Sequence, residues 1–164
     1  MKILESTKEH KKHFTVTGYV TTEDKGKLLL IHHKKLNKWL PPGGHLEENE
    51  IPHEGAMREV LEETGLAVTL AGIEEHDFSL RNIVDMQIPR PYALMYQIIP
   101  ENSKDVEHIH LDMVYIFVAD EYDSTLEANQ AEVYDVKWLT AAEILKSDDV
   151  FDSVKGFAKS YMKV

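Results

Sequence analysis

The chain lacks cysteine, which excludes a disulfide framework, a thiolate metal site and a thiol nucleophile. It also lacks any apolar run close to the about 20 residues that a membrane-spanning helix needs. Residues 1–13 are polar and charged, without the apolar core of a signal peptide. From these absences we expect a cytoplasmic protein that does not contact the membrane.

Basic residues are scarce compared with acidic ones, because 18 lysines and arginines face 29 aspartates and glutamates, for a formal net charge of -11. Such a chain repels a phosphate backbone, so long DNA or RNA is not expected as a partner. A phosphorylated substrate would need a divalent cation to shield it from these carboxylates. The length of 164 residues predicts a single domain over residues 1–164, with residues 1–13 as a lead-in segment.

Alternating and apolar segments predict several strands around one helix in the middle of the chain. Pro52 and Gly65 are start and stop signals for that helix, with Asn49 as a further start signal. We expect a loop at 37–45 that ends extended and a second loop at 79–91; prolines and glycines gather in the first, and prolines occur in the second. The predicted strands are 14–22, 27–33, 67–78, 92–99, 110–119 and 131–139, and the predicted helices are 51–64, 141–147 and 150–162. This order indicates an α+β layered domain.

Three glutamates of the central helix have the spacing of one helical face. Glu59, Glu62 and Glu63 stand at i, i+3 and i+4, so their carboxylates can converge. Like charges at this spacing cost a helix roughly 0.2–0.5 kcal/mol per pair, and a divalent cation would reverse that cost. Carboxylate oxygens suit Mg²⁺ or Mn²⁺. A solvated acidic surface is the alternative interpretation of these three residues alone.

The surrounding residues resemble a known family signature, the Nudix box. The string runs Gly44-x5-Glu50-x7-Arg58-Glu59-Val60-x-Glu62-Glu63-x-Gly65-Leu66, with every defining position filled. The preceding residues 39–47 are also similar to the approach to this box. The resemblance implies an α/β/α sandwich with a mixed β-sheet flanked by helices. It also implies Mg²⁺-dependent hydrolysis of a nucleoside diphosphate linked to another group, with Mn²⁺ as a substitute cofactor.

The same resemblance implies roles for the residues of the box. Glu59, Glu62 and Glu63 would bind the metal, joined by the carbonyl of Gly44. Arg58 would orient a glutamate through a bidentate bond rather than touch the substrate. The outer carboxylate would be Glu50, and Gly65 would supply the turn that ends the helix.

A carboxylate outside the box commonly assists in this family as a general base or a further ligand. Glu132, six residues before Trp138, is the first candidate, and an ordinary surface position is the alternative. Asp135 and Glu127 are weaker candidates.

Substrate contacts are predicted at His45, Arg81, Arg90 and Tyr92. His45 lies inside the box, and the two arginines flank the expected loop at 79–91, where a cation could hold a terminal phosphate. Tyr92, like Trp39, Phe78 and Tyr96, could stack on a nucleobase, although packing is the alternative for each.

A second polar pattern alternates along the predicted strand at 110–119. His108, His110 and Asp112 have the period that directs side chains to one face of a strand. They could reach a phosphate, a substrate or a second metal, or they could form a plain polar strand face. The sequence leaves both interpretations open.

The identity of the substrate stays open at this stage, among modified nucleoside triphosphates, dinucleoside polyphosphates and nucleotide sugars. The alternative to an enzyme is a catalytically silent Nudix-fold module that binds or senses a nucleotide. An RNA-end-processing hydrolase is a third possibility, against which the acidic composition argues. Many relatives pair as homodimers, and nothing in this sequence decides whether the present chain does.

Overall fold

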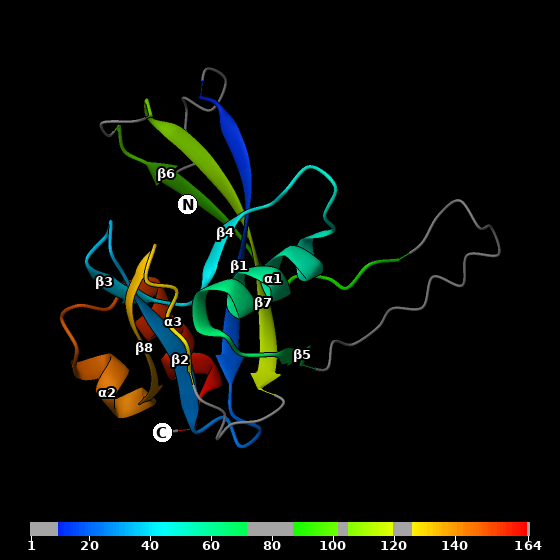
Figure 1. Cartoon of the computed structure of the whole chain (residues 1–164). Coiled ribbons are helices and arrows are strands. Elements are labelled where there is room, and N and C mark those ends of the chain that lie inside the picture. Colours follow the sequence, from blue (N-terminus) through cyan, green and yellow to red (C-terminus); the bar gives the residue numbers. More distant parts are fainter. Residues whose placement is uncertain (1–9, 72–86, 102–104, 120–125, 164) are drawn as a thin grey trace.

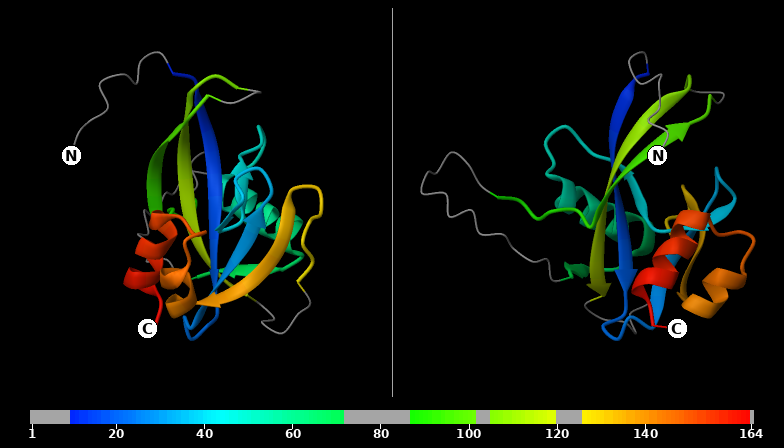
Figure 2. Two further views of the ribbon diagram at one scale, coloured as in Figure 1. Left: turned by 90° about the vertical axis from the view of Figure 1, so that its left-hand side faces the viewer. Right: turned by 180° about the vertical axis from the view of Figure 1, so that it is seen from behind.

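The computed structural model describes residues 10–71, 87–101, 105–119 and 126–163, which form a mixed sheet with helices on both faces (Figures 1 and 2). The strands are β1 (Lys12–Thr21), β2 (Lys27–His33), β3 (Lys38–Leu40), β4 (Gly43–His45), β5 (Val68–Leu70), β6 (Ala93–Ile99), β7 (His108–Ala119) and β8 (Val133–Thr140). The helices are α1 (Pro52–Thr64), α2 (Ala141–Lys146) and α3 (Asp152–Tyr161). The fold is therefore of the α+β class that the sequence predicts.

Strand β1 lies at the centre of the sheet, between β2 and β7, and it also pairs with β4. It runs parallel to β7 from Lys12 to Thr21, and its first half pairs with β4 in the antiparallel sense, with Thr15 opposite His45. Its far end pairs with β2, to which β3 and β8 are added, while β5 and β6 pair with β7. The short β4 is thereby held at the side of β1, next to α1 (Figure 1).

Two apolar clusters lie on the two faces of the sheet. Val16 and Val20 of β1 point to one face and pack in a cluster with Ala56 and Val60 of α1. Tyr19, from the alternate positions of the same strand, points to the other face, where the second cluster contains residues of α2 and α3. The sheet is thus covered by α1 on one side and by the two C-terminal helices on the other.

The signals at the two ends of α1 act where the sequence predicts, with one exception. Pro52 occupies the first turn, and Gly65 ends the helix with a φ of 71°, its N–H donating to the carbonyl of Leu61. Asn49, expected as a start signal, is not the capping residue; Ile51 takes that position without a side-chain hydrogen bond. The bounds of the helix therefore depend on the proline and the glycine.

The segment expected as a loop with an extended end, at 37–45, contains two short strands: β4 is the extended end, and β3 is a strand that the sequence did not predict. Each has three residues; β3 forms a short hairpin with the neighbouring β2, whereas β4 pairs with residues of β1 that lie far from it in sequence. Strand β7 begins at His108 rather than at 110, and β5 ends at Leu70. The remainder of the strand expected to 78 and most of the loop at 79–91 lie outside the described residues.

Within the described part of the chain, no helix is long and apolar enough to cross a membrane.

Candidate active site

The predicted metal-binding glutamates of the box meet around one depression of about 390 Å³ beside the C-terminal half of α1. β4 forms the wall opposite the helix, and the turn before β8 closes a third side. The lining residues are Gly43, Gly44, His45, Leu46, Glu47, Arg58, Glu59, Glu62, Glu63, Asn129 and Glu132. Every residue predicted from the sequence as catalytic or metal-binding is among them.

Glu63 is the most buried of these carboxylates, with 2% of its surface exposed. Its Oε2 accepts a hydrogen bond of 2.9 Å from the backbone N–H of Gly43, which fixes its position against β4. Burial raises the pKa of Glu63 to about 8; the N–H of Gly43 opposes this rise, and the negative charges of Glu59 and Glu132 add to it. A buried carboxylate with this environment needs a proton or a cation to neutralise it.

Arg58 connects the carboxylates of the box to one another. It binds Glu50 in a bidentate manner, with Nε 2.5 Å from Oε1 and Nη2 3.0 Å from Oε2. Its Nη1 donates to Glu59 at 2.9 Å and to Glu62 at 3.0 Å. The Arg58 hydrogen bond holds the pKa of Glu50 below its usual range. Arg58 therefore contacts carboxylates, which is the arrangement expected of an orienting residue.

Gly44 allows β4 to approach the glutamates of α1. A Cβ at this position would lie 2.4 Å from Oε1 of Glu59, which is too close for any side chain. The Glu59 carboxyl is itself mostly buried, and burial raises its pKa despite the hydrogen bond from Arg58. The glycine thus leaves the space between β4 and Glu59 free of side-chain atoms.

Glu132 reaches the depression from the turn that precedes β8. Its backbone is held at both sides, since its N–H donates to Asn129 and its carbonyl accepts from Lys34. The two weaker candidates lie elsewhere: Asp135 forms an ion pair of 2.6 Å with Lys137, and Glu127 lies against Gly65. Of the three carboxylates considered outside the box, the structure brings only Glu132 into the lining.

Comparison with known proteins identifies the class of the chain. The NUDIX domain family matches residues 11–159. The chain belongs to the Nudix family.

Individual relatives support this assignment. A MutT-like protein of Streptomyces ambofaciens is 33% identical over 132 residues, which cover 79% of this chain and 76% of the relative. A hydrolase of the NUDIX family from Clostridium perfringens has a similar crystal structure, with a TM-score of 0.74, 29% identity and coverage of 90% and 94% of the two chains. An 8-oxo-dGTP diphosphatase of Proteus vulgaris is 46% identical over 48 residues, 27% of this chain and 43% of the relative. The protein is therefore a Nudix hydrolase, an enzyme class that acts on pyrophosphate bonds.

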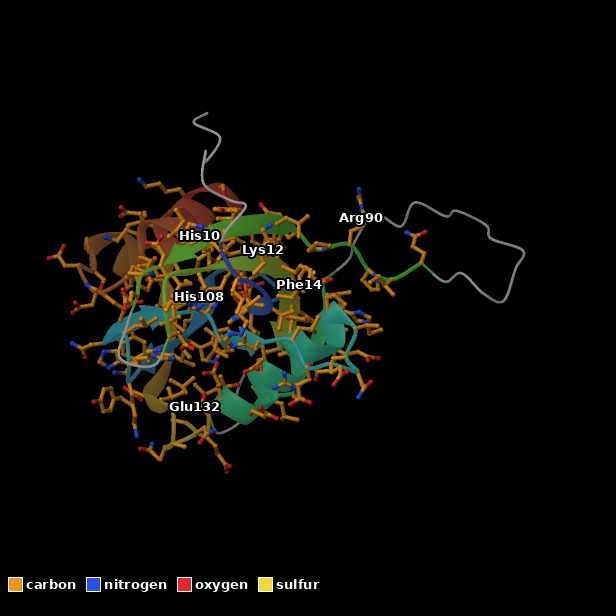
Figure 3. The ribbon with its side chains drawn as sticks, turned by 90° about the horizontal axis from the view of Figure 1, so that it is seen from above. His10, Lys12, Phe14, Arg90, His108 and Glu132 are labelled. Carbon is orange, nitrogen blue, oxygen red and sulfur yellow. The ribbon has the colours of Figure 1, made fainter. Side chains whose placement is uncertain are left out.

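The residues predicted to contact the substrate of this Nudix hydrolase are not all brought to the site. His45 lines the depression, and its carbonyl accepts a hydrogen bond from Arg58. Arg90 is exposed and lies apart from Glu132 across the molecule (Figure 3). Tyr92 faces Phe157 and Tyr161 of α3, on the other face of the sheet. Arg81 and Phe78 lie outside the described residues.

The sequence predicted only part of a histidine cluster that lies next to the box. His108 and His110 do alternate on one face of β7, as predicted, and they are joined there by His13 of β1 and His45 of β4. His45 and His110 are 32 and 97 residues away from His13 in sequence, so only strand pairing brings the three together. Asp112, the third residue of the predicted pattern, is instead buried and accepts hydrogen bonds from Thr15 and Thr17.

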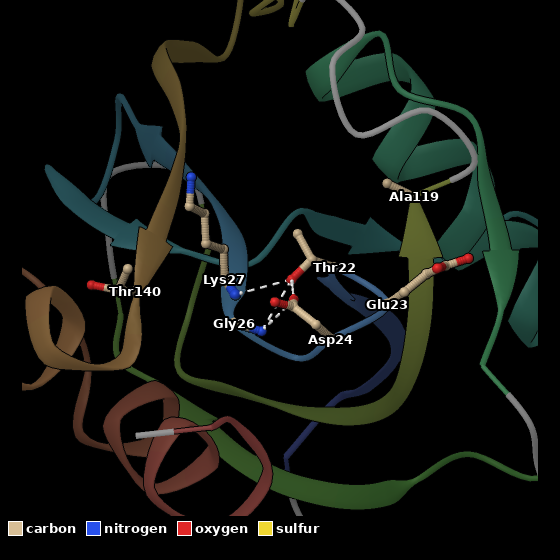
Figure 4. A pocket seen from close by; sticks show the side chains of 7 residues that line it. All are labelled: Thr22, Glu23, Asp24, Gly26, Lys27, Ala119 and Thr140. Carbon is tan, nitrogen blue, oxygen red and sulfur yellow. Dashed lines mark hydrogen bonds between the residues drawn. The ribbon is translucent and has the colours of Figure 1, made fainter.

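A larger depression of about 600 Å³ lies beside the turn between β1 and β2 (Figure 4). Its polar groups already serve the turn, since Asp24 accepts hydrogen bonds from Thr22 and from the N–H of Gly26. No residue of the Nudix box lines it. Size alone therefore does not distinguish the candidate active site of this Nudix hydrolase, whose distinguishing feature is its convergent carboxylates.

Proposed function

We propose that this Nudix hydrolase is a Mg²⁺-dependent pyrophosphohydrolase that cleaves a nucleoside diphosphate linked to another group. The observation that carries the proposal is the convergence of Glu59, Glu62, Glu63 and Glu132 on one depression beside Gly44. Two of these carboxylates, Glu59 and Glu63, have raised pKa values because they are buried near other negative charges. A cation bound there would offset the cost of ionising them.

The donor set fits Mg²⁺, with Mn²⁺ as a substitute. The available ligands are hard carboxylate oxygens, with the carbonyl of Gly44 as a fifth donor, and the chain supplies no sulfur from cysteine. Glu59, Glu62 and Glu63 would hold the metal, and Arg58 restrains two of them. When bound, the metal supplies charge neutralisation for substrate phosphates and lowers the pKa of bound water.

The residues of the chain then have separate tasks. Arg58 orients the glutamates through its bond to Glu50, and the N–H of Gly43 fixes Glu63. Glu132 is the proposed general base, which accepts a proton from the water that attacks one phosphorus. Attack breaks the bridging phosphorus–oxygen bond, and the pyrophosphate is converted with one water into two phosphate-bearing products and a proton. No covalent intermediate with the protein is needed.

The proposed substrate class is broad because the site residues account for the pyrophosphate bond and not for a particular nucleobase. The box positions the pyrophosphate bond, and the predicted base-stacking residue Tyr92 lies away from it against α3. Nucleoside triphosphates, dinucleoside polyphosphates and nucleotide sugars all present such a bond. The name of the Proteus vulgaris relative, an 8-oxo-dGTP diphosphatase, supports including oxidised deoxynucleoside triphosphates.

The test is a panel of these three substrate classes, with products identified by chromatography at several Mg²⁺ concentrations. We expect turnover of one class with Mg²⁺, loss of that turnover in excess EDTA, and near-complete loss in Glu63→Gln. Glu54→Gln is the matched control, because Glu54 is an exposed glutamate of the same helix outside the depression. Full activity in EDTA would overturn the mechanism, and tight ligand binding without turnover would identify a silent binding module instead.

A further inference from the structure

The histidine cluster lies on the opposite face of β4 from the glutamates of the box. Gly44 pairs with Val16, whose side chain packs in the cluster with α1, whereas His45 pairs with Thr15 on the other face. His13 alternates with Thr15 along β1, and His110 is its direct partner on β7. Three strands therefore bring three imidazoles to one place, separated from the carboxylate site by the backbone of β4.

One ring nitrogen from each of His13, His45 and His110 lies within 4.8 Å of the other two. Nδ1 of His13 is 3.2 Å from Nε2 of His45. Two imidazole ligands of a tetrahedral zinc ion, each about 2.0–2.1 Å from the metal, are separated by roughly 3.3–3.4 Å. The first pair thus already has the separation that shared coordination requires. The third nitrogen needs a movement of up to about 1.5 Å, which the exposed His45 ring can contribute.

His108 is placed to orient His110. Its Nδ1 lies 2.8 Å from the carbonyl of Val106, an acceptor only, so this nitrogen carries the proton. Its Nε2 is then an acceptor, and it lies 3.2 Å from Nε2 of His110, which must donate. That arrangement leaves Nδ1 of His110 with the free lone pair. A ligand imidazole held by a hydrogen bond at its other nitrogen is the usual pattern at metal sites.

Further observations distinguish the cluster from ordinary packing of aromatic rings. Burial and the neighbouring imidazoles lower the pKa of His110 to about 4, so that ring is in the neutral form that binds metals. His13 and His45 border a depression of about 420 Å³ whose charged lining residues are Lys11, Glu47, Glu48 and Glu50, so acidic groups outnumber basic ones along the entry.

We propose that His13, His45 and His110 form a binding site for a divalent transition metal of the Zn²⁺ class, distinct from the Mg²⁺ site of the Nudix box. Imidazole nitrogen is the ligand that Zn²⁺, Co²⁺ and Ni²⁺ prefer, and Mg²⁺ does not. The filled site joins β4 to β1 and β7, with a fourth position for water or a substrate oxygen. It is also linked to the box, because the carbonyl of His45 accepts a hydrogen bond from Arg58. The proposal does not depend on the hydrolase activity.

The test measures metal retained by the full chain after dialysis against micromolar Zn²⁺ with excess Mg²⁺ present. We expect a single bound Zn²⁺ per chain in the wild type and in a Glu59→Gln/Glu62→Gln variant, in which the carboxylate site is weakened. His110→Gln and His13→Gln should each weaken binding at least about 100-fold, more than the 10–100-fold expected for His108→Gln. His32→Gln is the matched control, since His32 stacks on Trp39 away from the cluster.

Two further readouts separate metal binding from a structural role. Co²⁺ in place of Zn²⁺ should give the absorption of a four-coordinate site with nitrogen ligands, and His110→Gln should abolish that absorption. Zn²⁺ should raise the Tm of the wild type and of His32→Gln, but not of His110→Gln. Unchanged zinc binding in both His110→Gln and His13→Gln would overturn the proposal. So would loss of zinc in the glutamate double variant, because the ion would then belong to the box.

Discussion

Arg58 binds Glu50 through two parallel hydrogen bonds, of 2.5 and 3.0 Å. Glu50 lies just before the helix that carries Arg58. The remaining guanidinium nitrogen, Nη1, then faces Glu59 and Glu62. Because the fork is planar and rigid, the bond to Glu50 determines where the other donor points. The geometry of the carboxylate site thus depends on a residue that contributes no metal ligand of its own.

Arg58→Lys tests this dependence while preserving the charge. A lysine ammonium cannot make the bidentate bond, so Glu59 and Glu62 lose a fixed donor. We expect kcat/KM to fall about 10–100-fold, together with weaker binding of Mg²⁺ measured by titration of activity. Circular dichroism should show an unchanged fold. Wild-type activity in Arg58→Lys would mean that charge alone, without the fork, positions the glutamates.

Glu132→Gln tests the assignment of the general base. The substitution keeps the shape of the side chain and removes its ability to accept a proton, so we expect kcat to fall about 10²–10⁴-fold. Glu127→Gln is the matched control, because Glu127 lies against Gly65 rather than in the depression. The two variants should have similar Tm values. Equal kcat values for both variants would remove Glu132 from the mechanism.

The sequence predicted the parts of the site that are local, and it could not predict the parts that depend on strand pairing. The spacing of Glu59, Glu62 and Glu63 fixes their common helical face, and the structure places all three in one depression. The bounds of β2 also agree, since an apolar strand between a turn and a polar loop has clear limits. These features need no information about distant residues.

Features that depend on distant residues were missed or were predicted only in part. The strand β4 has three residues and forms only because Thr15–Thr17 of β1 offers backbone partners, so its composition is typical of a loop. The meeting of His13 with His110 depends on the parallel register of β1 and β7, which side-chain alternation in a single strand does not reveal. Tyr92 was expected near a nucleobase, yet it packs against aromatic neighbours of α3 on the other face.

The buried carboxyl of Glu63 predicts how the metal-free protein responds to pH. Its pKa in the folded state is about 8, above the value of about 4.3 in an unfolded chain. Between these values the folded state holds a proton that the unfolded state has released. The contribution of Glu63 to stability is therefore fully present below about pH 4 and is lost as the pH rises through 8.

In EDTA we expect the Tm of the wild type to fall as the pH rises from about 5 to about 8. Glu63→Gln removes the titrating group and keeps an acceptor for the Gly43 N–H, so its Tm should fall less and should exceed that of the wild type at the upper end. Glu54→Gln is the control, because Glu54 is an exposed glutamate of the same helix outside the depression. Parallel curves of Tm against pH for the wild type and Glu63→Gln would show that ionising Glu63 in the folded state costs no free energy.

Alanine substitutions of Gly65 and Gly156 should change the stability of the fold in opposite directions. Gly65 ends α1 with a φ of 71°, and a Cβ there would lie 3.0 Å from Cβ of Glu127. Gly65→Ala should therefore destabilise the fold by about 1–2 kcal/mol, since L-residues are strained in the left-handed region. Gly156 lies exposed within α3, and a Cβ at this position would meet no atom within 4 Å outside the adjoining backbone of its own helix. Gly156→Ala should accordingly stabilise the fold by about 0.5–1 kcal/mol.

Chemical denaturation of both variants measures these differences directly, and the unfolding slopes should match that of the wild type. For a chain of this size, each kcal/mol corresponds to roughly 2–4 °C in Tm. Because Gly65 also positions the end of the helix that carries Glu62 and Glu63, Gly65→Ala should lower kcat as well, whereas Gly156→Ala should leave it unchanged. A stabilised Gly65→Ala would contradict the left-handed turn at the end of α1, and with it the placement of the last two glutamates of the box.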